Sequence, residues 1–436
     1  MAKLFKKPIF VSISPNAQKD DVWLAFKLIF SPWKWTRPLI QNLDVVIKNG
    51  AVHKFTNELK NYFGLKYIFT FDSGRTSLYA ILRALNFGNG DEVLVQAFTC
   101  TAAVNPILWV GAAPVYVDIL KDTYNMSPSD LEKKITPKSK AIIVQHTFGL
   151  PAQIDKISKI AKKNNLILLE DVAHSFGAEY LNKKLGTWGD AAFFSFGRFK
   201  IISAVFAGAA GTNNPEIGEK LRKFYEEQSE PSRFWIFQQL FHPIILAFAK
   251  PFYNIFSLGK FAVIIVKKLK LISLSVYSEE KSGGKPDFGP SRMPDSLAEL
   301  GLNQFKKTEK FNEYRRELST IYFEELKNCE KIILPKVLDG AKPVFLYFPI
   351  LLKGGDLDYY KLIGWGRRKE GIYLENWPAK KVIGPKGVDL EKLKYIAGSC
   401  PVAEEAAKRI VVLPTNPNTS EKDAQRVCEF IKKALK

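Results

Sequence analysis

The residues best suited to chemistry lie between Leu166 and Lys200, where an acid and an amine follow two apolar runs. The run at 166–169 predicts a buried strand that delivers Asp171 at its carboxyl end, the edge at which open α/β sheets bind ligands. A second run, at 191–196, ends shortly before Lys200. Pyridoxal phosphate (PLP) needs a carboxylate to keep its pyridine nitrogen protonated and an amine to form a Schiff base. The stretch therefore predicts a PLP site.

Each of these residues also has a structural interpretation. An Asp after a strand is commonly the N-cap of a helix, and a single lysine in a basic chain is usually a solvated charge. A lone histidine is more often a hydrogen-bonded structural residue than a catalytic one. Taken singly, Asp171, His174 and Lys200 favour that interpretation. Taken together and in this order, after two predicted strands, they favour the cofactor site.

Motifs on both sides of this stretch resemble a known family. They begin with DSGRTSL at 72–78 and continue with GDEVLVQAFTCTAAVNPILWVGAAPVYVDI, EDVAHSFGA, GDAAFFSFGRFK and, from residue 292, RMPDSLAELGLNQF. In order and spacing they resemble the DegT/StrS-type PLP-dependent sugar aminotransferases, which belong to fold type I of the aspartate aminotransferase superfamily. The resemblance covers most of residues 45–215 and 291–436.

The resemblance implies roles for four residues of the central stretch. Lys200 matches the lysine that forms the internal aldimine with PLP, and Asp171 matches the partner of the pyridine nitrogen. His174 matches a Gln or His at the ring face or the ring hydroxyl, and Ser195 matches a phosphate ligand. Dehydratase relatives carry histidine in place of the lysine, so Lys200 favours transamination.

The loop Gly74-Arg75-Thr76 matches the turn that holds the cofactor phosphate through backbone amides, and amides at a helix N-terminus suit anions generally. Four positions depart from the family pattern. Arg75 stands where this loop usually has a threonine. Cys100 stands where an aromatic residue usually covers the cofactor ring. Pro290 stands where an asparagine usually reaches the phosphate of the neighbouring subunit. Trp377 replaces the tyrosine of the usual His-Tyr-Pro sequence in the small domain.

The activity implied by the resemblance is transfer of an amino group from an amino acid, with glutamate as the expected donor, to a keto-sugar carried on a nucleotide. This is a step of polysaccharide biosynthesis. Lys200, once freed, would move the α-proton as general base and acid. The family's site lies at a dimer interface, so a homodimer is expected. Two alternatives stay open: a fold-type-I enzyme that acts on a lipid-linked or amino-acid substrate, and a membrane-bound scaffold or sensor that keeps the fold without turnover.

Apolar runs that alternate with helical patterns, such as those at 128–135 and 154–164, predict an α/β fold with a mostly parallel central sheet flanked by helices. A basic, aromatic N-terminal arm at 1–50 precedes a large PLP-binding domain at 51–300. That domain holds a basic apolar helical insertion at about 215–290. A linking helix and a small C-terminal α/β domain fill residues 301–436.

Residues 231–278 are the part least like the family. They contain no Asp or Glu, and scattered Lys and Arg break them into apolar pieces shorter than the ~20 residues of a spanning helix. Such a segment suits an anionic membrane surface, as does 22–40, and the formal net charge of +20 also favours an acidic partner. The alternative is a helical hairpin that packs on a dimer partner or covers the mouth of the site. The sequence has no recognisable nucleic-acid module, so nucleic acid is not expected.

The cysteine usage predicts a cytoplasmic protein. In such a protein, the basic apolar segments would lie at the inner face of the membrane. Metal-ligand spacing is lacking among the four cysteines, Cys100, Cys329, Cys400 and Cys428. Reduced thiols and no structural metal are therefore expected. The arm has no small-residue cleavage site after an adequate apolar core, so a signal peptide is not expected.

Overall fold

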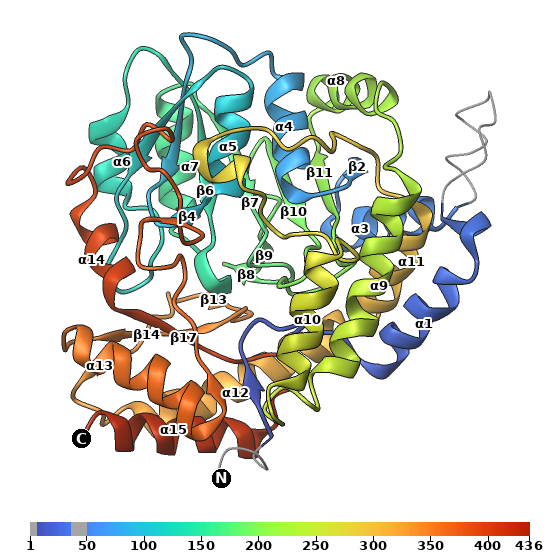
Figure 1. The fold of residues 1–436 in the computed structure, drawn as a ribbon. Coiled ribbons are helices and arrows are strands. Elements are labelled where there is room, and N and C mark those ends of the chain that lie inside the picture. The colour runs from blue at the N-terminus through green and yellow to red at the C-terminus, as the bar shows by residue number, and fades with distance from the viewer. Residues whose placement is uncertain (1–6, 36–49) are drawn as a thin grey trace.

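A computed structural model describes residues 7–35 and 50–436, and a seven-stranded sheet lies at its centre (Figure 1). The strands lie in the order β2-β11-β10-β7-β6-β3-β5. From β10 to β5 all neighbours are parallel, whereas β11 runs antiparallel to β10 and β2. The strand bounds are Tyr67–Phe71 (β2), Glu92–Gln96 (β3), Ala113–Val117 (β5), Ser139–Gln145 (β6), Ile167–Asp171 (β7), Ala191–Ser195 (β10) and Gly208–Thr212 (β11).

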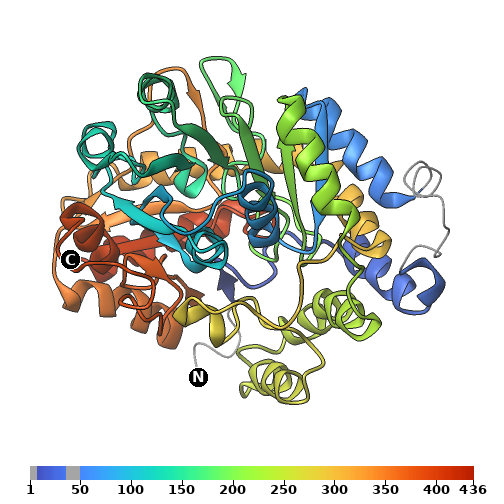
Figure 2. The ribbon, with the colours of Figure 1, turned by 90° about the horizontal axis from the view of Figure 1, so that it is seen from above.

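Helices lie on both sides of this sheet (Figure 2). Because both faces are covered, the parallel strands form continuous apolar runs instead of alternating ones. The helical patterns expected at 128–135 and 154–164 are α6 (Pro128–Lys134) and α7 (Ile154–Lys163). The expected fold class, a mostly parallel α/β sheet flanked by helices, is confirmed. The other helices of this part are α3 (Ala51–Phe63), α4 (Gly74–Ala84), α5 (Thr101–Trp109) and α8 (Pro215–Glu226).

A second, three-stranded antiparallel sheet lies in the C-terminal part of the chain. Its strands are β12 (Ile332–Ile333), β14 (Phe348–Leu352) and β17 (Ile410–Leu413). The long helix α12 (Thr308–Leu326) follows α11 (Asp295–Phe305) and packs against the closing helix α15 (Glu421–Ala434). The domain boundary near residue 300 stays a proposal.

The apolar run at 344–352 becomes a strand only from Phe348 onward. Its first half hydrogen-bonds instead to the loop that follows β6. Val344 N donates to the carbonyl of Gly149 (3.1 Å), and Leu346 N donates to that of Phe148 (2.8 Å). These bonds fasten the C-terminal part of the chain to the central sheet near the carboxyl ends of its strands.

The described part of the N-terminal segment packs against the rest of the protein. Strand β1 (Ile9–Phe10) pairs in parallel with β15 (Ile372–Tyr373), and α1 (Lys19–Ile29) packs on α9 and α11. The Asn16 side chain donates hydrogen bonds to the carbonyls of Lys200 and Ile201 and accepts one from Arg315. This asparagine therefore ties the N-terminal segment to the loop that carries Lys200. Residues 36–40 of the expected membrane-binding stretch lie outside the described residues.

The insertion forms a helical hairpin of α9 (Arg233–Ala249) and α10 (Leu258–Lys268), followed by a loop with the short helix η3 (Glu279–Ser282). Helix α9 packs on both α1 and α10, so the three helices lie together along one side of the molecule (Figure 1). Of the helices in the described ranges, none has the length and apolar content that a bilayer-spanning segment needs.

Candidate active site

A cavity of about 340 Å³ lies where β7 and β10 end, at the edge where open α/β sheets bind ligands. The structure brings most of the expected site residues to its lining, namely Gly74, Arg75, Cys100, Asp171, His174, Ser195 and Lys200. Thr76 lies outside this lining. Its amide donates to Ser73 Oγ (3.2 Å) and its hydroxyl donates to Asp72 Oδ1 (2.6 Å), so both groups already have partners.

Adjacent parallel strands bring Asp171 and Lys200 together. Asp171 is the last residue of β7, and Lys200 follows the end of the neighbouring β10. Burial raises the pKa of Asp171, while the Ala173 amide and Lys200 lower it. Burial lowers the pKa of Lys200, while Cys100 and Asp171 raise it. The net effect lowers the pKa of Lys200, which increases the share of the neutral amine, the form that attacks a carbonyl carbon.

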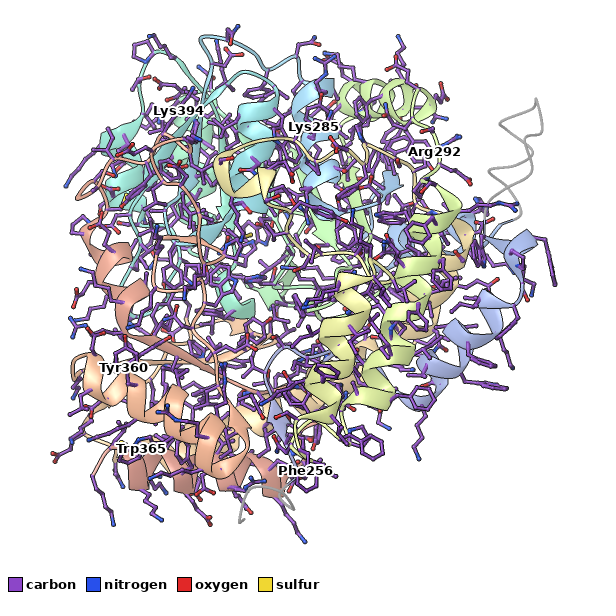
Figure 3. The ribbon with its side chains drawn as sticks, viewed as in Figure 1. Phe256, Lys285, Arg292, Tyr360, Trp365 and Lys394 are labelled. Carbon is purple, nitrogen blue, oxygen red and sulfur yellow. The ribbon has the colours of Figure 1, made fainter. Side chains whose placement is uncertain are left out.

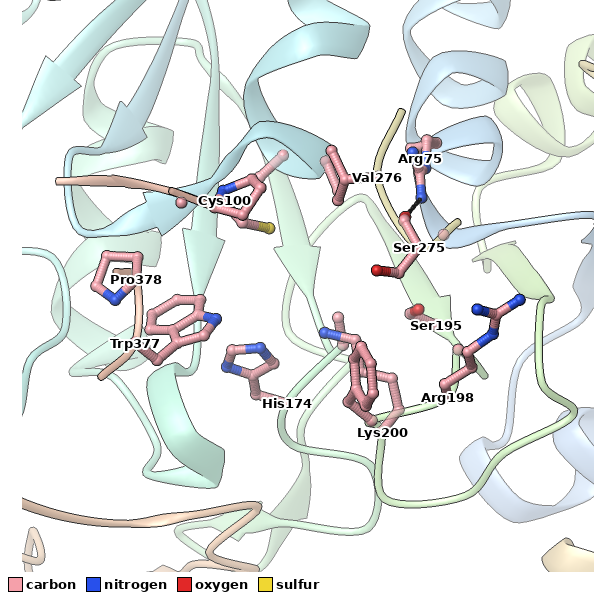
Figure 4. Close-up of a pocket in the computed structure, with 18 of the residues that line it drawn as sticks. Arg75, Cys100, His174, Ser195, Arg198, Lys200, Ser275, Val276, Trp377 and Pro378 are labelled. Carbon is pink, nitrogen blue, oxygen red and sulfur yellow. Dashed lines mark hydrogen bonds between the residues drawn. The ribbon is translucent and has the colours of Figure 1, made fainter. Parts of the chain in front are cut away.

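The imidazole of His174 faces the cavity beside the indole of Trp377 (Figure 4). Their ring centroids are 4.8 Å apart, with an angle of 67° between the ring planes. Nδ1 of His174 accepts a hydrogen bond from Phe148 N (3.4 Å), which assigns the ring proton to Nε2. Burial, together with nearby Lys200, lowers the pKa of His174 well below its ordinary value. A neutral imidazole can contact an aromatic ligand without adding charge to the cavity.

The first turn of α4 closely approaches the end of β10. A Cβ atom on Gly74 would lie 2.8 Å from Ser195 Cβ, so a glycine is required for this approach. Ser73 caps the helix by accepting the Thr76 amide. The amides of Gly74 and Arg75 belong to the helix start, where intrahelical acceptors are missing. Together with the Ser195 hydroxyl they form a corner that suits an anion.

The side chain of Arg75 contacts the insertion. Its Nη1 forms a buried ion pair with Glu280, and its Nη2 donates to the carbonyl of Ser275 (2.6 Å). Ser275 and Val276 also line the cavity. The C-terminal loop of the insertion is therefore fastened over part of the cavity by a residue of the expected phosphate-binding turn.

Several lining residues were missed by sequence reasoning, among them Arg198, Phe206, Tyr347 and Glu375. Arg198 had a usable signal, because it is an arginine inside the quoted motif that ends at Lys200. Tyr347 and Glu375 come from the C-terminal part of the chain. No spacing in the sequence connects them to Lys200, so only the fold reveals their place.

The lining fits PLP. Asp171 Oδ1 is fixed by the Ala173 amide (2.9 Å), which presents the carboxylate to a pyridine nitrogen. Burial lowers the pKa of the Lys200 amine, and the close approach at Gly74 places the α4 amides at the edge of the cavity. Cys100, the N-cap of α5, lines the same cavity, and burial raises the pKa of its thiol.

Within the described ranges, no three His, Cys, Asp or Glu side chains gather as a metal site requires.

Comparisons with known proteins agree with this fit. An uncharacterised protein of Methanocaldococcus jannaschii is 31% identical over 403 residues, which cover 90% of this chain and 92% of that protein. GDP-perosamine synthase of Escherichia coli O157:H7 is 28% identical, with 88% and 90% of the two chains covered. The solved structure of Helicobacter pylori PseC, an aminotransferase involved in the biosynthesis of pseudoaminic acid, matches with a TM-score of 0.74 at 21% identity, covering 98% of this chain and 99% of that one.

The model of the DegT/DnrJ/EryC1/StrS aminotransferase family matches residues 40–239 and 266–432. The interruption falls in α9 and α10, the hairpin of the insertion. Both matched segments contribute to the cavity, which holds Lys200 and Asp171 from the first and Trp377 from the second. The chain therefore belongs to the DegT/DnrJ/EryC1/StrS aminotransferase family and is a PLP-dependent aminotransferase.

Proposed function

We propose that this enzyme transfers an amino group from an amino acid, with glutamate as the donor, to the keto group of a nucleotide-linked sugar. The observation that carries the proposal is the meeting of Asp171 and Lys200 in one cavity, since these are the groups with which a PLP enzyme activates an amine. The name of the E. coli relative, a GDP-perosamine synthase, supports a nucleotide sugar as the acceptor.

The site residues have distinct tasks in this proposal. When bound, PLP supplies an aromatic ring that stabilises negative charge on the substrate carbon. Asp171 would keep the pyridine nitrogen protonated, and His174 would contact the ring. The amine of Lys200 would carry the α-proton of the donor as general base and then as general acid. The phosphate contacts come from Gly74, Arg75 and Ser195, while Thr76 supports their turn through Asp72.

The two half-reactions can be tested separately through the colour of the bound cofactor. We expect glutamate to bleach the visible band of the purified protein and a nucleotide-linked keto-sugar to restore it. A panel of GDP-, UDP- and dTDP-linked keto-sugars would identify the acceptor, and a lipid-linked keto-sugar in the same panel tests the alternative that the insertion favours. Bleaching without recovery on any nucleotide sugar would argue against the proposed acceptor. A band that no amino donor bleaches would favour a scaffold or sensor.

The assembly and the domain division belong to the same proposal. The resemblance to the family supports a homodimer, and the two sheets support a large domain up to about residue 300 followed by a smaller one. Sedimentation of the holoenzyme measures whether it is a homodimer. Limited proteolysis near residue 300 measures the division into two domains.

The proposed place of action is an anionic membrane surface, reached through α1, α9, α10 and the turns beside them. Phe256, in the turn between α9 and α10, is 82% exposed (Figure 3). Lys267 and Lys268 are exposed at the end of α10. Basic aromatic helices lie in the plane of a bilayer interface, where cations meet anionic headgroups. Other large apolar side chains exposed on these elements are Trp23, Phe26, Phe30, Trp33, Phe234, Phe248, Phe252, Leu258, Phe261, Ile264, Ile265 and Leu269.

Charge reversal on α10 tests the membrane proposal. We expect the wild type to float with anionic liposomes, to bind neutral liposomes less, and to dissociate as salt rises. Glutamate at Lys260, Lys267, Lys268 and Lys270 should abolish flotation, because each basic residue near the surface contributes about 1 kcal/mol. The variant should keep its cofactor colour, since these four residues lie outside the cavity lining.

The matched control reverses four exposed lysines on a helix of the central domain, namely Lys156, Lys159, Lys162 and Lys163 of α7. This variant has the same net charge and should still float. Flotation of the α10 variant would contradict the membrane proposal. If the α10 variant instead separates into colourless monomers, the hairpin belongs to a dimer interface.

Substitution of Cys100 tests how the cofactor ring is covered. If this thiol lies against the ring, Cys100→Phe or Cys100→Trp should retain PLP as well as or better than the wild type. A stacked aromatic side chain adds about 0.5–1.5 kcal/mol, a two- to tenfold gain in affinity. PLP titration of the apo-protein measures the change, with Cys100→Ala as the control for loss of the thiol. Loss of PLP in both aromatic variants would mean that the pocket is built differently on this side.

A further inference from the structure

Arg198 is a buried cation in the cavity lining that no role given above uses. Its side chain is only 8% exposed. Nη1 donates to the carbonyl of Ser273 (2.7 Å), and Nη2 donates to the side-chain oxygens of Ser273 and Gln239 (2.5 and 3.1 Å). Nε is buried without an acceptor among the described residues. Whereas Arg75 pairs with Glu280, no carboxylate within residues 7–35 and 50–436 forms an ion pair with Arg198.

An unpaired buried charge is unfavourable, because the protein replaces only part of the solvation that water supplies. Burial lowers the pKa of Arg198 to about 10, with Tyr277 raising it and Arg75 lowering it. At neutral pH the guanidinium therefore stays charged. The cavity consequently holds a positive charge that an anionic ligand would compensate.

Arg198 lies at the α4 end of the cavity, beside Ser195 (Figure 4). The guanidinium carbons of Arg75 and Arg198 are 5.4 and 5.8 Å from the centroid of the Phe206 ring. Gly208, which follows shortly in the chain, pairs with Ser195 across β10 and β11. It lies so close to α4 that a Cβ atom on it would be 2.5 Å from the first backbone nitrogen of the helix. These contacts hold Arg198 near the corner formed by Ser195 and the first turn of α4.

We propose that Arg198 is the counter-ion of the cofactor phosphate in this enzyme. A phosphate monoester carries between one and two negative charges at neutral pH. Ser195 and the α4 amides supply hydrogen bonds without a formal charge, and the charge of Arg75 is already paired with Glu280. Pro290 stands where the family pattern has an asparagine that reaches the phosphate of the neighbouring subunit. Arg198 would thus supply from the same chain a contact that the resemblance assigns to a partner.

The insertion positions this cation. Ser273 and Gln239 belong to the insertion, and together they accept three hydrogen bonds from the Arg198 guanidinium. Its loop is also fastened by Arg75 through Ser275 and Glu280. Gln239 and Ser273 flank residues 240–265, the part of the hairpin that the family model does not match, so the flanks of the hairpin position the phosphate end of the site. The way in which the phosphate of PLP is held does not depend on which donor and which sugar the enzyme uses.

The experiment compares binding of PLP with binding of pyridoxal, which has the same ring and aldehyde but no phosphate. Both are titrated into the apo-protein and followed by absorbance. We expect Arg198→Gln to weaken PLP by about ten- to a hundredfold, the effect of losing a charge-assisted contact, and to leave pyridoxal unchanged. Arg198→Lys keeps the charge and should retain most of the preference for PLP. Inorganic phosphate should raise the Tm of the wild-type apo-protein more than that of Arg198→Gln.

The control Ser273→Ala removes the hydroxyl that binds Nη2 but keeps the guanidinium, so its preference for PLP over pyridoxal should equal that of the wild type. Equal weakening of PLP and pyridoxal in Arg198→Gln would overturn the proposal, because Arg198 would then only support the loop. Unchanged PLP binding with a raised KM for glutamate would overturn it in favour of a donor carboxylate.

If Arg198→Gln does not fold, ³¹P NMR of the wild-type holoenzyme tests instead whether the phosphate lies beside a cation. A phosphate beside a guanidinium should stay dianionic as the pH falls through its ordinary second pKa of about 6, because a neighbouring cation favours the charged form. A phosphate resonance that titrates at its ordinary pKa would overturn the proposal.

Discussion

Replacement of Lys200 by alanine is expected to abolish amino transfer while the protein still folds. The wild-type amine is held in a cavity that lowers its pKa, so it is available as a nucleophile toward the cofactor aldehyde and as a base toward the donor. Alanine removes both functions. Turnover should fall to the uncatalysed background, and borohydride should trap no covalent adduct between cofactor and protein. Mass spectrometry of the reduced protein locates the adduct, and circular dichroism checks the fold.

Lys223→Ala, a change on the exposed side of α8, is the matched control and should keep both colour and turnover. The pH dependence gives a second check on the wild type. Because burial lowers the pKa of Lys200, incorporation of PLP into the apo-protein should speed up as the pH rises and level off below the ordinary lysine pKa of about 10.4. A trapped adduct on another lysine would remove Lys200 from its role.

Asp171→Asn is expected to keep part of the bound cofactor and to lose most of the turnover. The carboxylate lies at the end of β7, where the Ala173 amide fixes one of its oxygens. A neutral amide cannot hold a proton on the pyridine nitrogen, and the ring then becomes a poorer acceptor of electrons. We expect a fall in kcat of about a hundred- to a thousandfold, the scale of losing one preorganised electrostatic contact. Single-turnover bleaching by glutamate measures it.

Asp190→Asn serves as the control, because Asp190 accepts a hydrogen bond from Leu168 N before the start of β10, away from the cavity. It should affect stability more than turnover. Wild-type turnover in Asp171→Asn would mean that this carboxylate does not act on the cofactor.

The central sheet could be predicted because its strands carry their signal locally. The run at 166–169 is apolar without interruption since β7 is covered on both faces, and β7 forms there. The run at 344–352 has the same appearance, yet its first half bonds to residues 148 and 149. Hydrogen bonds to residues distant in the sequence cause this difference between the two runs. These partners cannot be identified from the composition of the run itself.

For the candidate site, too, some residues could be predicted from local motifs, whereas others depend on partners distant in the sequence. Motif order led to Lys200, Asp171 and Gly74, and all three line one cavity. Thr76 falls outside the lining, and the Ser73 cap already uses its amide, a detail of helix geometry that a matched motif does not contain. The place of Arg198 depends on Ser273, which lies 75 positions away in the chain, and no spacing in the sequence connects the two.

The hydrogen bonds from Asn16 to the Lys200 loop also bear on when the active site becomes complete during synthesis. Asn16 is synthesised before its partner Arg315 and before Asn418, whose amide donates to the carbonyls of Pro15 and Ala17. Strand β1 likewise cannot form its pairing until β15 has been synthesised. Contacts between residues so distant in sequence form late in folding. A nascent chain could complete the central sheet and still leave the Lys200 loop unfastened, so activity would arrive only with the C-terminal residues.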